Sequence, residues 1–408
     1  MDGMNKNALP GFKKKRYQQK KDIIKDFYRW GILSKPEVCR LTNMTMPTIS
    51  KIVDELVEEG WVVNRGQGPS IGGKRPHIYS LNPDAAYIIG IDLGRETLKI
   101  AIFNLHKEVI GSIQQFPSIL ESQDNEAILS DLRLKIEKSL IDLKIPRNKL
   151  KVAGVSIPGL LDNSGNSYTY LTFEEGNIRQ RLEAMLGIPV FMDNDSSVMA
   201  MAEHTFGAAR ESMHALCISV NECIGMGMIL NGHPYTGCKG MAGEFGHVRV
   251  TEEDILCYCG KTGCLETLAS GRAIIKAACQ AIKSGKATTI SARPEEITLD
   301  KIVEAATHDD IFAIELLQQA GEKIGEALAA LIHLFNPELI VIGGKVTANN
   351  NIMLPSIRHS IDKYTLTRLK NQCEIKASTL GDNACILGTL SLVMENLNYD
   401  PEGKYSLY

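Results

Sequence analysis

The sequence predicts a mixed α/β protein in which a small helical head precedes a larger body of two α/β lobes. The chain has 408 residues, which is too long for one ordinary core. Charge separates the two parts, because residues 1–80 hold 15 Lys and Arg against 8 Asp and Glu, whereas the rest holds 30 against 40. From residue 83 onward, strand patterns alternate with helical patterns. We therefore place a head at residues 1–82 and a body at residues 83–408.

The composition is typical of a globular protein. The sequence has no run of about 18 apolar residues that could span a membrane. Its basic start at residues 13–16 leads into an amphipathic segment and not into an apolar signal core. We expect a cytoplasmic protein with no membrane partner. The basic head indicates a polyanionic partner for that part alone, with a merely solvated basic tail as the alternative.

The head begins with two predicted helices. Residues 20–30 form the first, because apolar residues recur there at helical spacing, at Ile23, Ile24, Phe27 and Trp30. Gly31 follows where a helix would stop. Ser34 and Glu37 match a capping box, so a second helix should run to about Leu41.

A third helix follows a short turn and ends at Gly60, with Thr45 as a possible cap. Its expected buried stripe is Ile49, Ile52, Val53, Leu56 and Val57. Small polar and basic residues near its start suit a helix that enters the major groove of DNA, and a plain three-helix bundle is the alternative. The candidate DNA-contacting residues of this helix are Thr45, Met46, Pro47, Thr48, Ser50 and Lys51.

The continuation "WVVNRGQGPSIGGKRPHIYSL" favours the DNA-binding interpretation. It predicts two strands joined by a glycine-rich tip that carries Lys74 and Arg75, which a wing would bring to phosphate or the minor groove. The head is therefore predicted to be a winged helix-turn-helix. The acidic rear half of the third helix should point away from the duplex, at Asp54, Glu55, Glu58 and Glu59.

The body is predicted to have two lobes, residues 83–205 together with the C-terminal helix, and residues 206–380. The segment "AYIIGIDLGRETLKIAIFN" reads as a strand hairpin, and "HALCISVNECIGMGMILNG" as a second strand pair. The strand "IPVFMDN" delivers Asp193, Asn194 and Asp195 to its carboxyl end just before a helix. Sites in α/β sheets lie at such strand ends.

The segment "GEFGHVRVTEEDILCYCGKTGCLE" holds a candidate metal site. His247, Cys257, Cys259 and Cys264 supply one imidazole and three thiolates, which close a tetrahedral site without an open position for water. This favours structural zinc over a Lewis acid, and chance clustering of buried cysteines is the alternative. The other cysteines are dispersed, as in a protein with reduced thiols. The metal would fix the flanking Glu244 and Glu266.

Several motifs together resemble transcriptional regulators of the ROK family, of the kind represented by xylose and N-acetylglucosamine repressors. They are "GGKRPHIYSLNPDAAYIIGIDLG", "SIPGLLD", "DNDSS", "GEFGH" and "CYCGKTGCLE". The resemblance covers the chain from about residue 20 to the C-terminal helix. It implies an actin-like hexokinase fold for the body and zinc on the four residues named above. It also implies a sugar site built from Asn194, Asp195, Glu244, His247 and Glu266, with the loop of Pro158 and Gly159 nearby.

Kinases of this family use an aspartate that matches Asp195 to accept the proton of the attacking sugar hydroxyl. Their phosphate loops are rich in glycine and threonine, whereas this chain has Arg95 and Glu96 in the first loop and Glu222 in the second. Like charges about 4 Å apart repel by about 4 kcal/mol at an effective dielectric near 20. Glu222 would then weaken nucleotide binding roughly a thousandfold.

We therefore expect a regulator and not an enzyme. It would bind operator DNA as a homodimer or homotetramer and respond to a sugar or sugar phosphate. One alternative is a ROK sugar kinase that carries a DNA-binding head, and another is a zinc-containing DNA-binding protein without a ligand. The particular sugar, the operator sequence and the sign of regulation do not follow from these residues.

Overall fold

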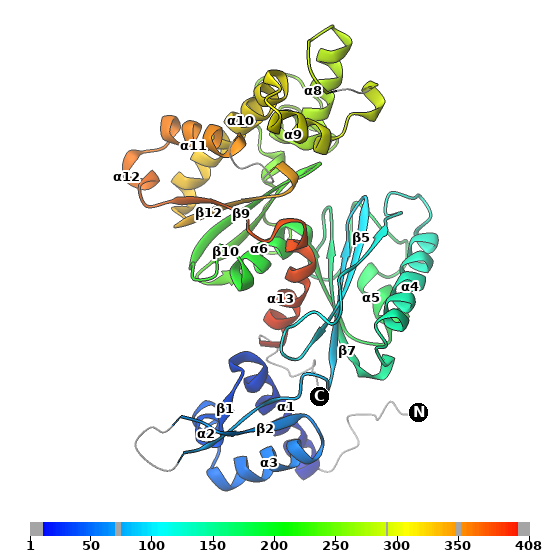
Figure 1. Ribbon diagram of the computed structural model, residues 1–408, viewed down its shortest axis with the longest axis vertical. Coiled ribbons are helices and arrows are strands. Elements are labelled where there is room, and N and C mark those ends of the chain that lie inside the picture. The colour runs from blue at the N-terminus through cyan, green and yellow to red at the C-terminus, as the bar shows by residue number, and fades with distance from the viewer. Residues whose placement is uncertain (1–10, 70–74, 291–292, 347–351, 399–408) are drawn as a thin grey trace. The chain divides into compact units, whose positions relative to one another are not determined.

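The computed structural model describes residues 11–69, 75–290, 293–346 and 352–398 (Figure 1). The chain divides into two compact units. The first contains Met1–Val155, Tyr170–Met192 and Leu392–Tyr408, and the second contains Ser156–Thr169 and Asp193–Ser391. The mixed α/β class is as predicted. The first unit joins the head to the first sheet of the body, so the boundary at residues 82 and 83 stays a prediction. No helix among the described residues is long and apolar enough to cross a membrane.

The three predicted helices and two predicted strands of the head occur in the expected order (blue in Figure 1), and a short strand between the first two helices was not predicted. Three helices and a three-stranded sheet of order β1-β3-β2 form it. Their bounds are α1 (Gly11–Trp30), β1 (Leu33–Ser34), α2 (Lys35–Thr42), α3 (Met46–Glu58), β2 (Val62–Gln67) and β3 (His77–Leu81). The helix α1 begins earlier than the expected residue 20. The helices α2 and α3 follow each other closely, and the antiparallel pair β2–β3 comes directly after them.

The predicted capping box is confirmed, because the Ser34 side chain accepts from the amide of Glu37 and Glu37 Oε2 accepts from Ser34 N at 2.7 Å. The expected cap at Thr45 needs correction. Thr45 occupies the N-cap position, but its hydroxyl lies 2.9 Å from the hydroxyl of Thr48 and makes no capping bond to an amide. The two side chains therefore bond each other across the first turn of α3.

The apolar stripes of α1 and α3 are buried as predicted, except at two positions. Trp30 is 54% exposed, because it is the last residue of α1, and the guanidinium of Arg29 lies 5.0 Å from its ring. Val57 is 36% exposed, because it lies one residue beyond the buried Leu56 and is rotated away from the stripe. The core of the head is otherwise closed around Phe27, with the buried residues Ile23, Ile24, Val38, Ile49, Ile52, Val53, Leu56 and Val62.

The first sheet of the body has five strands in the order β6-β5-β4-β7-β8. The predicted hairpin is its β4–β5 pair, which runs antiparallel from Tyr87 opposite Asn104 to Leu93 opposite Leu98. The bounds are β4 (Tyr87–Leu93), β5 (Thr97–Asn104), β6 (Gln114–Pro117), α4 (Asn125–Asp142), η2 (Arg147–Lys149), β7 (Leu150–Ile157), α5 (Ile178–Leu186) and β8 (Val190–Asn194).

The second sheet has the order β11-β10-β9-β12-β13, with β9 antiparallel to β10 and parallel to β12. Its strands are β9 (His214–Val220), β10 (Ile224–Leu230), β11 (His233–Pro234), β12 (Leu339–Gly343) and β13 (Glu374–Ala377). The α-helices of this part are α6 (Asp195–Phe206), α7 (Glu266–Ala269), α8 (Gly271–Lys283), α9 (Leu299–Thr307), α10 (Ile311–Phe335), α11 (Met353–Tyr364), α12 (Thr367–Lys370) and α13 (Ala384–Asn398). Short 3₁₀ turns are η3 (Phe245–His247), η4 (Pro294–Glu296) and η6 (Gly381–Asn383).

Two glycines allow α6 to lie close against β10. A Cβ atom on Gly225 would collide with Ser196 Oγ, and one on Gly227 would collide with the carbonyl of Ser196 and with Ala200. Because Asp195 is the first residue of α6, this close packing fixes its position relative to β10. Gly225 thus has a structural role, whatever the loop before it binds.

Candidate functional site

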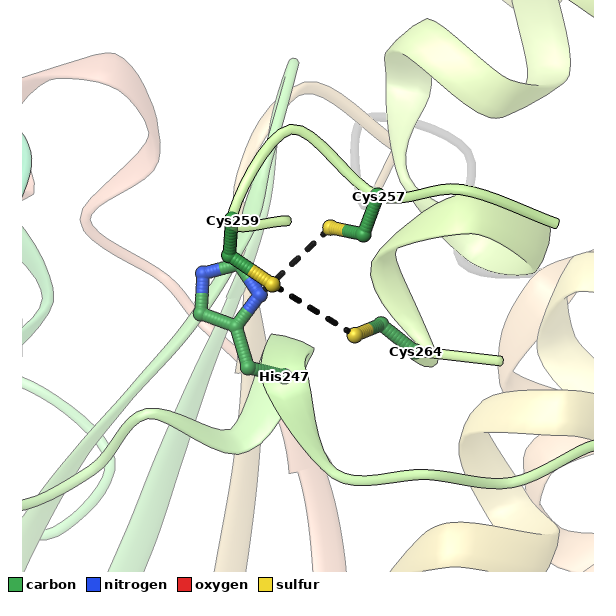
Figure 2. A group of neighbouring side chains, drawn as sticks. All are labelled: His247, Cys257, Cys259 and Cys264. Carbon is green, nitrogen blue, oxygen red and sulfur yellow. Dashed lines mark hydrogen bonds between the residues drawn. The ribbon is translucent and has the colours of Figure 1, made fainter. Parts of the chain in front are cut away.

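The four predicted metal ligands lie together in the second unit. One donor atom from each of His247, Cys257, Cys259 and Cys264 lies within 4.8 Å of the others, and Figure 2 shows them pointing toward one centre. Both His247 Nδ1 to Cys257 Sγ and Cys259 Sγ to Cys264 Sγ measure 3.7 Å. Tetrahedral zinc–thiolate bonds of about 2.3 Å would separate two sulfurs by about 3.8 Å. The donor set and its spacing therefore fit a metal ion.

Local turns bring these ligands together. Phe245 in η3 is buried and anchors His247, while Cys257 N donates to Lys261 O at 2.8 Å and closes the turn between the cysteines. Gly263 has a φ of +75°, and a Cβ atom there would meet the carbonyl of Thr251. Burial raises the pKa of the Cys264 thiol to about 12. A cation that binds this sulfur would take the place of its proton.

His247 connects the cysteine cluster to the predicted sugar residues. Its Nδ1 faces Cys257, whereas its Nε2 lies 3.2 Å from the hydroxyl of Tyr258 and 3.8 Å from Glu244 Oε2. Tyr258 also contacts the imidazole edge to face, with ring centres 5.2 Å apart. Tyr258 is not among the predicted site residues, although its position between the two metal-ligand candidates Cys257 and Cys259 could have indicated it.

The structure brings Asn194 and Asp195 to the loop of Pro158 and Gly159. Asn194 Nδ2 donates to the carbonyl of Gly159 at 2.8 Å, and Asn194 Oδ1 accepts from Ser196 N at 2.9 Å. Asp195 Oδ1 also accepts from Ser196 N, at 2.8 Å. Pro158 is buried and has no amide hydrogen, so it shapes the loop and offers no donor.

Glu244 interacts electrostatically with His247, Asp195 and Glu266. Burial raises the pKa of Glu244, His247 opposes the shift, and the negative charges of Asp195 and Glu266 reinforce it. Glu266 is buried, and its Oε2 accepts from Ile224 N at 2.7 Å. Gly246 leaves room for this contact, because a Cβ atom there would lie 2.8 Å from Glu266 Oε2. Fixed acceptors and an imidazole are groups that can bind hydroxyls.

The segment that stands in place of the second phosphate loop of the kinases is held by α8. Glu222 Oε2 lies 3.3 Å from Arg272 Nη2, and the carbonyls of Asn221 and Glu222 accept from Gly271 N and Arg272 N at 2.8 and 3.1 Å. The guanidinium partly offsets the charge of Glu222. The repulsion of a phosphate is therefore smaller than the isolated-charge value of about 4 kcal/mol.

The first predicted phosphate loop belongs to the first unit and is described there alone. Gly94 is required by a close turn, because a Cβ atom on it would collide with the carbonyl of Thr97. The guanidinium of Arg95 lies 5.7 Å from the ring centre of Tyr170, within the range of a cation–π contact. Arg95 thus has a partner within its own unit.

The candidate DNA-contacting residues lie on the outer side of the head. Thr45, Met46, Pro47, Lys51 and Arg75 are exposed, whereas Thr48 and Ser50 are half-buried. Lys74 lies outside the described residues.

The acidic rear half of α3 pairs with basic residues of the head itself. Glu55 binds Arg16 at 2.8 Å and Lys20 at 3.0 Å, and Glu59 also binds Lys20. Asp54 binds Lys35 at 2.7 Å. These carboxylates are therefore largely compensated within the head.

The fold, the cysteine cluster and the motifs identify the class of protein. The chain belongs to the ROK family, whose profile matches residues 88–396. The head, residues 1–82, precedes this match.

Particular relatives share almost the whole chain. The xylose repressor of Caldicellulosiruptor bescii is 30% identical over 93% of this chain and 96% of its own. A solved ROK family transcriptional regulator, a homolog of the E. coli MLC protein, has a TM-score of 0.77 at 26% identity and covers 94% of this chain and 96% of its own. A ROK family glucokinase from Streptomyces griseus, solved with glucose and AMPPNP, has a TM-score of 0.65 at 24% identity. The match covers 75% of this chain and 99% of the glucokinase. It shows only that the body of this chain and the glucokinase share a fold.

Proposed function

We propose that this protein is a sugar-responsive transcriptional repressor. One observation carries the proposal: a single chain joins an exposed helix-turn-helix face to a cluster of fixed carboxylates around His247. A 30% identical relative named as a xylose repressor matches both parts over nearly its full length. The head, residues 1–82, is the proposed DNA-binding domain, and residues 83–408 are the proposed sugar-binding domain.

The first turns of α3 are the proposed reading element. Thr45, Met46, Pro47 and Lys51 are exposed there and can reach base edges and phosphates in the major groove, with Thr48 and Ser50 beside them. Arg75, together with Lys74, would contact phosphate or the minor groove from the β2–β3 hairpin. The compensated charges of Asp54, Glu55 and Glu59 remove a repulsion that a free acidic helix would exert on DNA.

The sugar effector is proposed to bind Asn194, Asp195, Glu244, His247 and Glu266, with the Pro158 and Gly159 loop beside them. Carboxylates accept hydrogen bonds from hydroxyl groups, and their combined negative charge favours a neutral sugar over one with a phosphate near Asp195. The bond between Asn194 and the carbonyl of Gly159 would hold the loop against these acceptors.

The proposed metal is structural zinc on His247, Cys257, Cys259 and Cys264. Zinc prefers such a set of three thiolates and one imidazole and would hold the loop in one conformation. A metal on Nδ1 leaves Nε2 of His247 as a hydrogen-bond donor directed toward Glu244 and Tyr258. The sugar would then meet a donor and an acceptor with a fixed relative orientation.

We propose that the protein acts as a homodimer or homotetramer in the cytoplasm and is not an enzyme. Paired heads would bind two half-sites of an operator. The altered phosphate loops favour recognition of a sugar without phosphoryl transfer, because Arg95, Glu96 and Glu222 stand where the kinases have glycine or threonine.

The second candidate is a sugar kinase with a DNA-binding head, and the retained Asp195 at the start of α6 favours it. A coupled assay with glucose, xylose, N-acetylglucosamine and Mg-ATP separates the two. We expect no turnover, whereas a rate above about 1 per second would make the protein a kinase.

The main test measures operator affinity with and without sugar. The purified protein would first select its operator DNA from a random library, and the selected DNA would be labelled with a fluorophore. Fluorescence anisotropy would then measure the affinity of the protein for this DNA without ligand and with each of the same sugars. The 6-phosphates of glucose and N-acetylglucosamine would be included. Coupling of about 1 to 3 kcal/mol would change the affinity between about 5- and 150-fold.

Two variants locate the response. Glu244→Gln should reduce the sugar effect, and Glu252→Gln should leave it unchanged, because Glu252 contacts Arg249 on the surface and its side chain is 95% exposed. If no sugar alters operator affinity, the protein is not a sugar-responsive repressor. Selection of no DNA at all would contradict the role of the head as well.

A further inference from the structure

Tyr258 lies in the turn that carries two of the metal-ligand candidates. Two backbone bonds close this turn, from Cys257 N to Lys261 O at 2.8 Å and from Gly260 N to Cys257 O at 2.9 Å. Cys257 and Cys259 flank Tyr258 in the sequence, so a metal held by both would fix the backbone on each side of it. The main chain of Tyr258 is therefore held, and its side chain is the part that can move.

The side chain of Tyr258 is 62% exposed. Its ring meets the imidazole of His247 edge to face, with the ring centres 5.2 Å apart, and its hydroxyl lies 3.2 Å from His247 Nε2. An exposed side chain gives up little packing when it changes rotamer. Tyr258 can therefore leave His247 without a change in the core of the second unit.

His247 Nε2 can serve one acceptor well. With a metal on Nδ1, the hydrogen of the neutral imidazole is on Nε2, and that nitrogen donates a single hydrogen bond. Glu244 Oε2 lies 3.8 Å away, which is beyond the usual N–H···O range of about 2.7 to 3.2 Å, whereas the Tyr258 hydroxyl is within that range. Tyr258 is therefore the acceptor that His247 serves in this structure.

A sugar hydroxyl that binds His247 needs the same N–H group. We propose that Tyr258 competes with the sugar for His247 Nε2 and thereby sets the affinity and selectivity of the site. The inference rests on the proposed function, in which His247 is one of the sugar-binding residues. A sugar hydroxyl reaches His247 only after the phenol has rotated away, whereas a sugar with no hydroxyl at this point leaves Tyr258 in place.

The competition has a consequence for selectivity. The sugar hydroxyl that meets His247 replaces a hydrogen bond that already exists, so only the difference between the two bonds adds to the affinity. The unmodified protein should therefore gain little from this one hydroxyl. Removal of the phenol hydroxyl should make the same sugar hydroxyl more valuable.

The test measures sugar affinity by calorimetry in the zinc-loaded, full-length protein and in Tyr258→Phe. The probes are glucose, xylose and N-acetylglucosamine. Phenylalanine keeps an aromatic ring beside His247 but has no hydroxyl, so we expect the affinity for a sugar that binds to rise about two- to tenfold. Tyr364→Phe is the matched control and should leave the affinity unchanged, because Tyr364 lies in the same unit, at the end of α11, and is 46% exposed.

Deoxy sugars separate competition at His247 from a general change in the loop. The probes are the mono-deoxy analogues of whichever of the three sugars binds most tightly. We expect one analogue whose affinity Tyr258→Phe does not raise, because that analogue lacks the hydroxyl that meets His247. An equal rise for every analogue would show that the substitution acts on the loop as a whole, and the competition would be wrong.

Fluorine NMR follows the side chain directly. In protein labelled with 3-fluorotyrosine, the signal of residue 258 is the one that Tyr258→Phe removes. We expect this signal to shift when sugar is added, because the ring leaves the imidazole of His247. A signal that stays in place while calorimetry reports sugar binding would refute the displacement.

The remaining outcomes are also decisive. An unchanged affinity in Tyr258→Phe would overturn the competition, and a lower affinity would make the Tyr258 hydroxyl a sugar-binding group instead. Zinc content should be equal in the two proteins, and a loss of zinc from Tyr258→Phe would assign Tyr258 to the metal loop alone. If neither protein binds any of the three sugars, the proposed function fails together with this inference. If the unmodified protein binds sugar and Tyr258→Phe binds it no better, this inference alone fails.

Discussion

Asp310 should stabilise the second unit through its ionised carboxylate. It caps α10, the longest helix described, by accepting from Ala313 N at 2.9 Å. Its other oxygen accepts from the hydroxyls of Thr288 and Thr289, at 2.9 and 2.8 Å, and from the amide of Thr289. The carboxylate therefore joins the start of α10 to the segment that follows α8.

The size of this effect follows from the pKa. Burial alone would raise the pKa of Asp310, but the bonds from Thr289, Ala313 and Thr288 outweigh it and hold the pKa at about 2, against 3.8 in an unfolded chain. Lowering the pKa from 3.8 to about 2 corresponds to about 2 kcal/mol of stability. Because the folded pKa is the lower one, this stability is present above about pH 4 and is lost as the pH falls toward 2.

The assay is urea unfolding of the unmodified protein and of Asp310→Asn, followed by circular dichroism. We expect the variant to lose about 2 kcal/mol at pH 7, and the gap to narrow as the pH falls from about 4 to about 2. Asp309→Asn is the control, because Asp309 is exposed and asparagine tolerates its φ of +62°. A gap that is absent at pH 7, or that stays constant with pH, would refute this account of Asp310.

Three further predictions concern the site and the head. Cys259→Ser, or chelation of the metal, should abolish stoichiometric zinc binding, which atomic absorption measures. Either change should also weaken sugar binding, which calorimetry measures. An unchanged sugar affinity in the metal-free protein would contradict the role of His247. Gly246→Ala should destabilise the second unit by about 1 to 3 kcal/mol, because the added Cβ would collide with the carbonyl of Ile224 and with Glu266, and thermal unfolding measures the loss. The Arg16 contact holds the pKa of Glu55 at about 2, so Glu55→Gln should destabilise the head by about 1 kcal/mol after allowance for solvent screening. The difference in unfolding free energy between the unmodified protein and Glu55→Gln should be present above about pH 4.5 and vanish toward pH 2. If the two unfolding free energies do not converge as the pH is lowered, this role of Glu55 is wrong.

The sequence predicted the elements whose signals are local. Helical spacing located α3, the capping box located α2, and a close ligand spacing located the cysteine cluster. These features depend on residues that are close in the sequence, at most 17 positions apart, from His247 to Cys264. The same reasoning located Asn194 and Asp195 at a strand end before a helix.

Features that depend on distant residues were not predictable in this way. Arg272 partly offsets the charge of Glu222 from 50 positions away, and Arg16 pairs with Glu55 from 39 positions away. Charge patterns along the chain do not reveal such pairs, so the repulsion at Glu222 was overestimated. Trp30 was predicted to be buried and is exposed. Helical spacing indicates which residues share a face, but it does not indicate how far along the helix another element packs against that face.

The ion pairs on the rear of α3 also bear on how salt affects the head. Arg16, Lys20 and Lys35 count toward its positive charge, but each faces a carboxylate of α3. Such cations do not displace condensed counterions from a duplex, and each phosphate contact that is not made lowers the salt slope by about 0.9. Operator binding should therefore depend less steeply on ionic strength than the number of lysines and arginines in the head suggests.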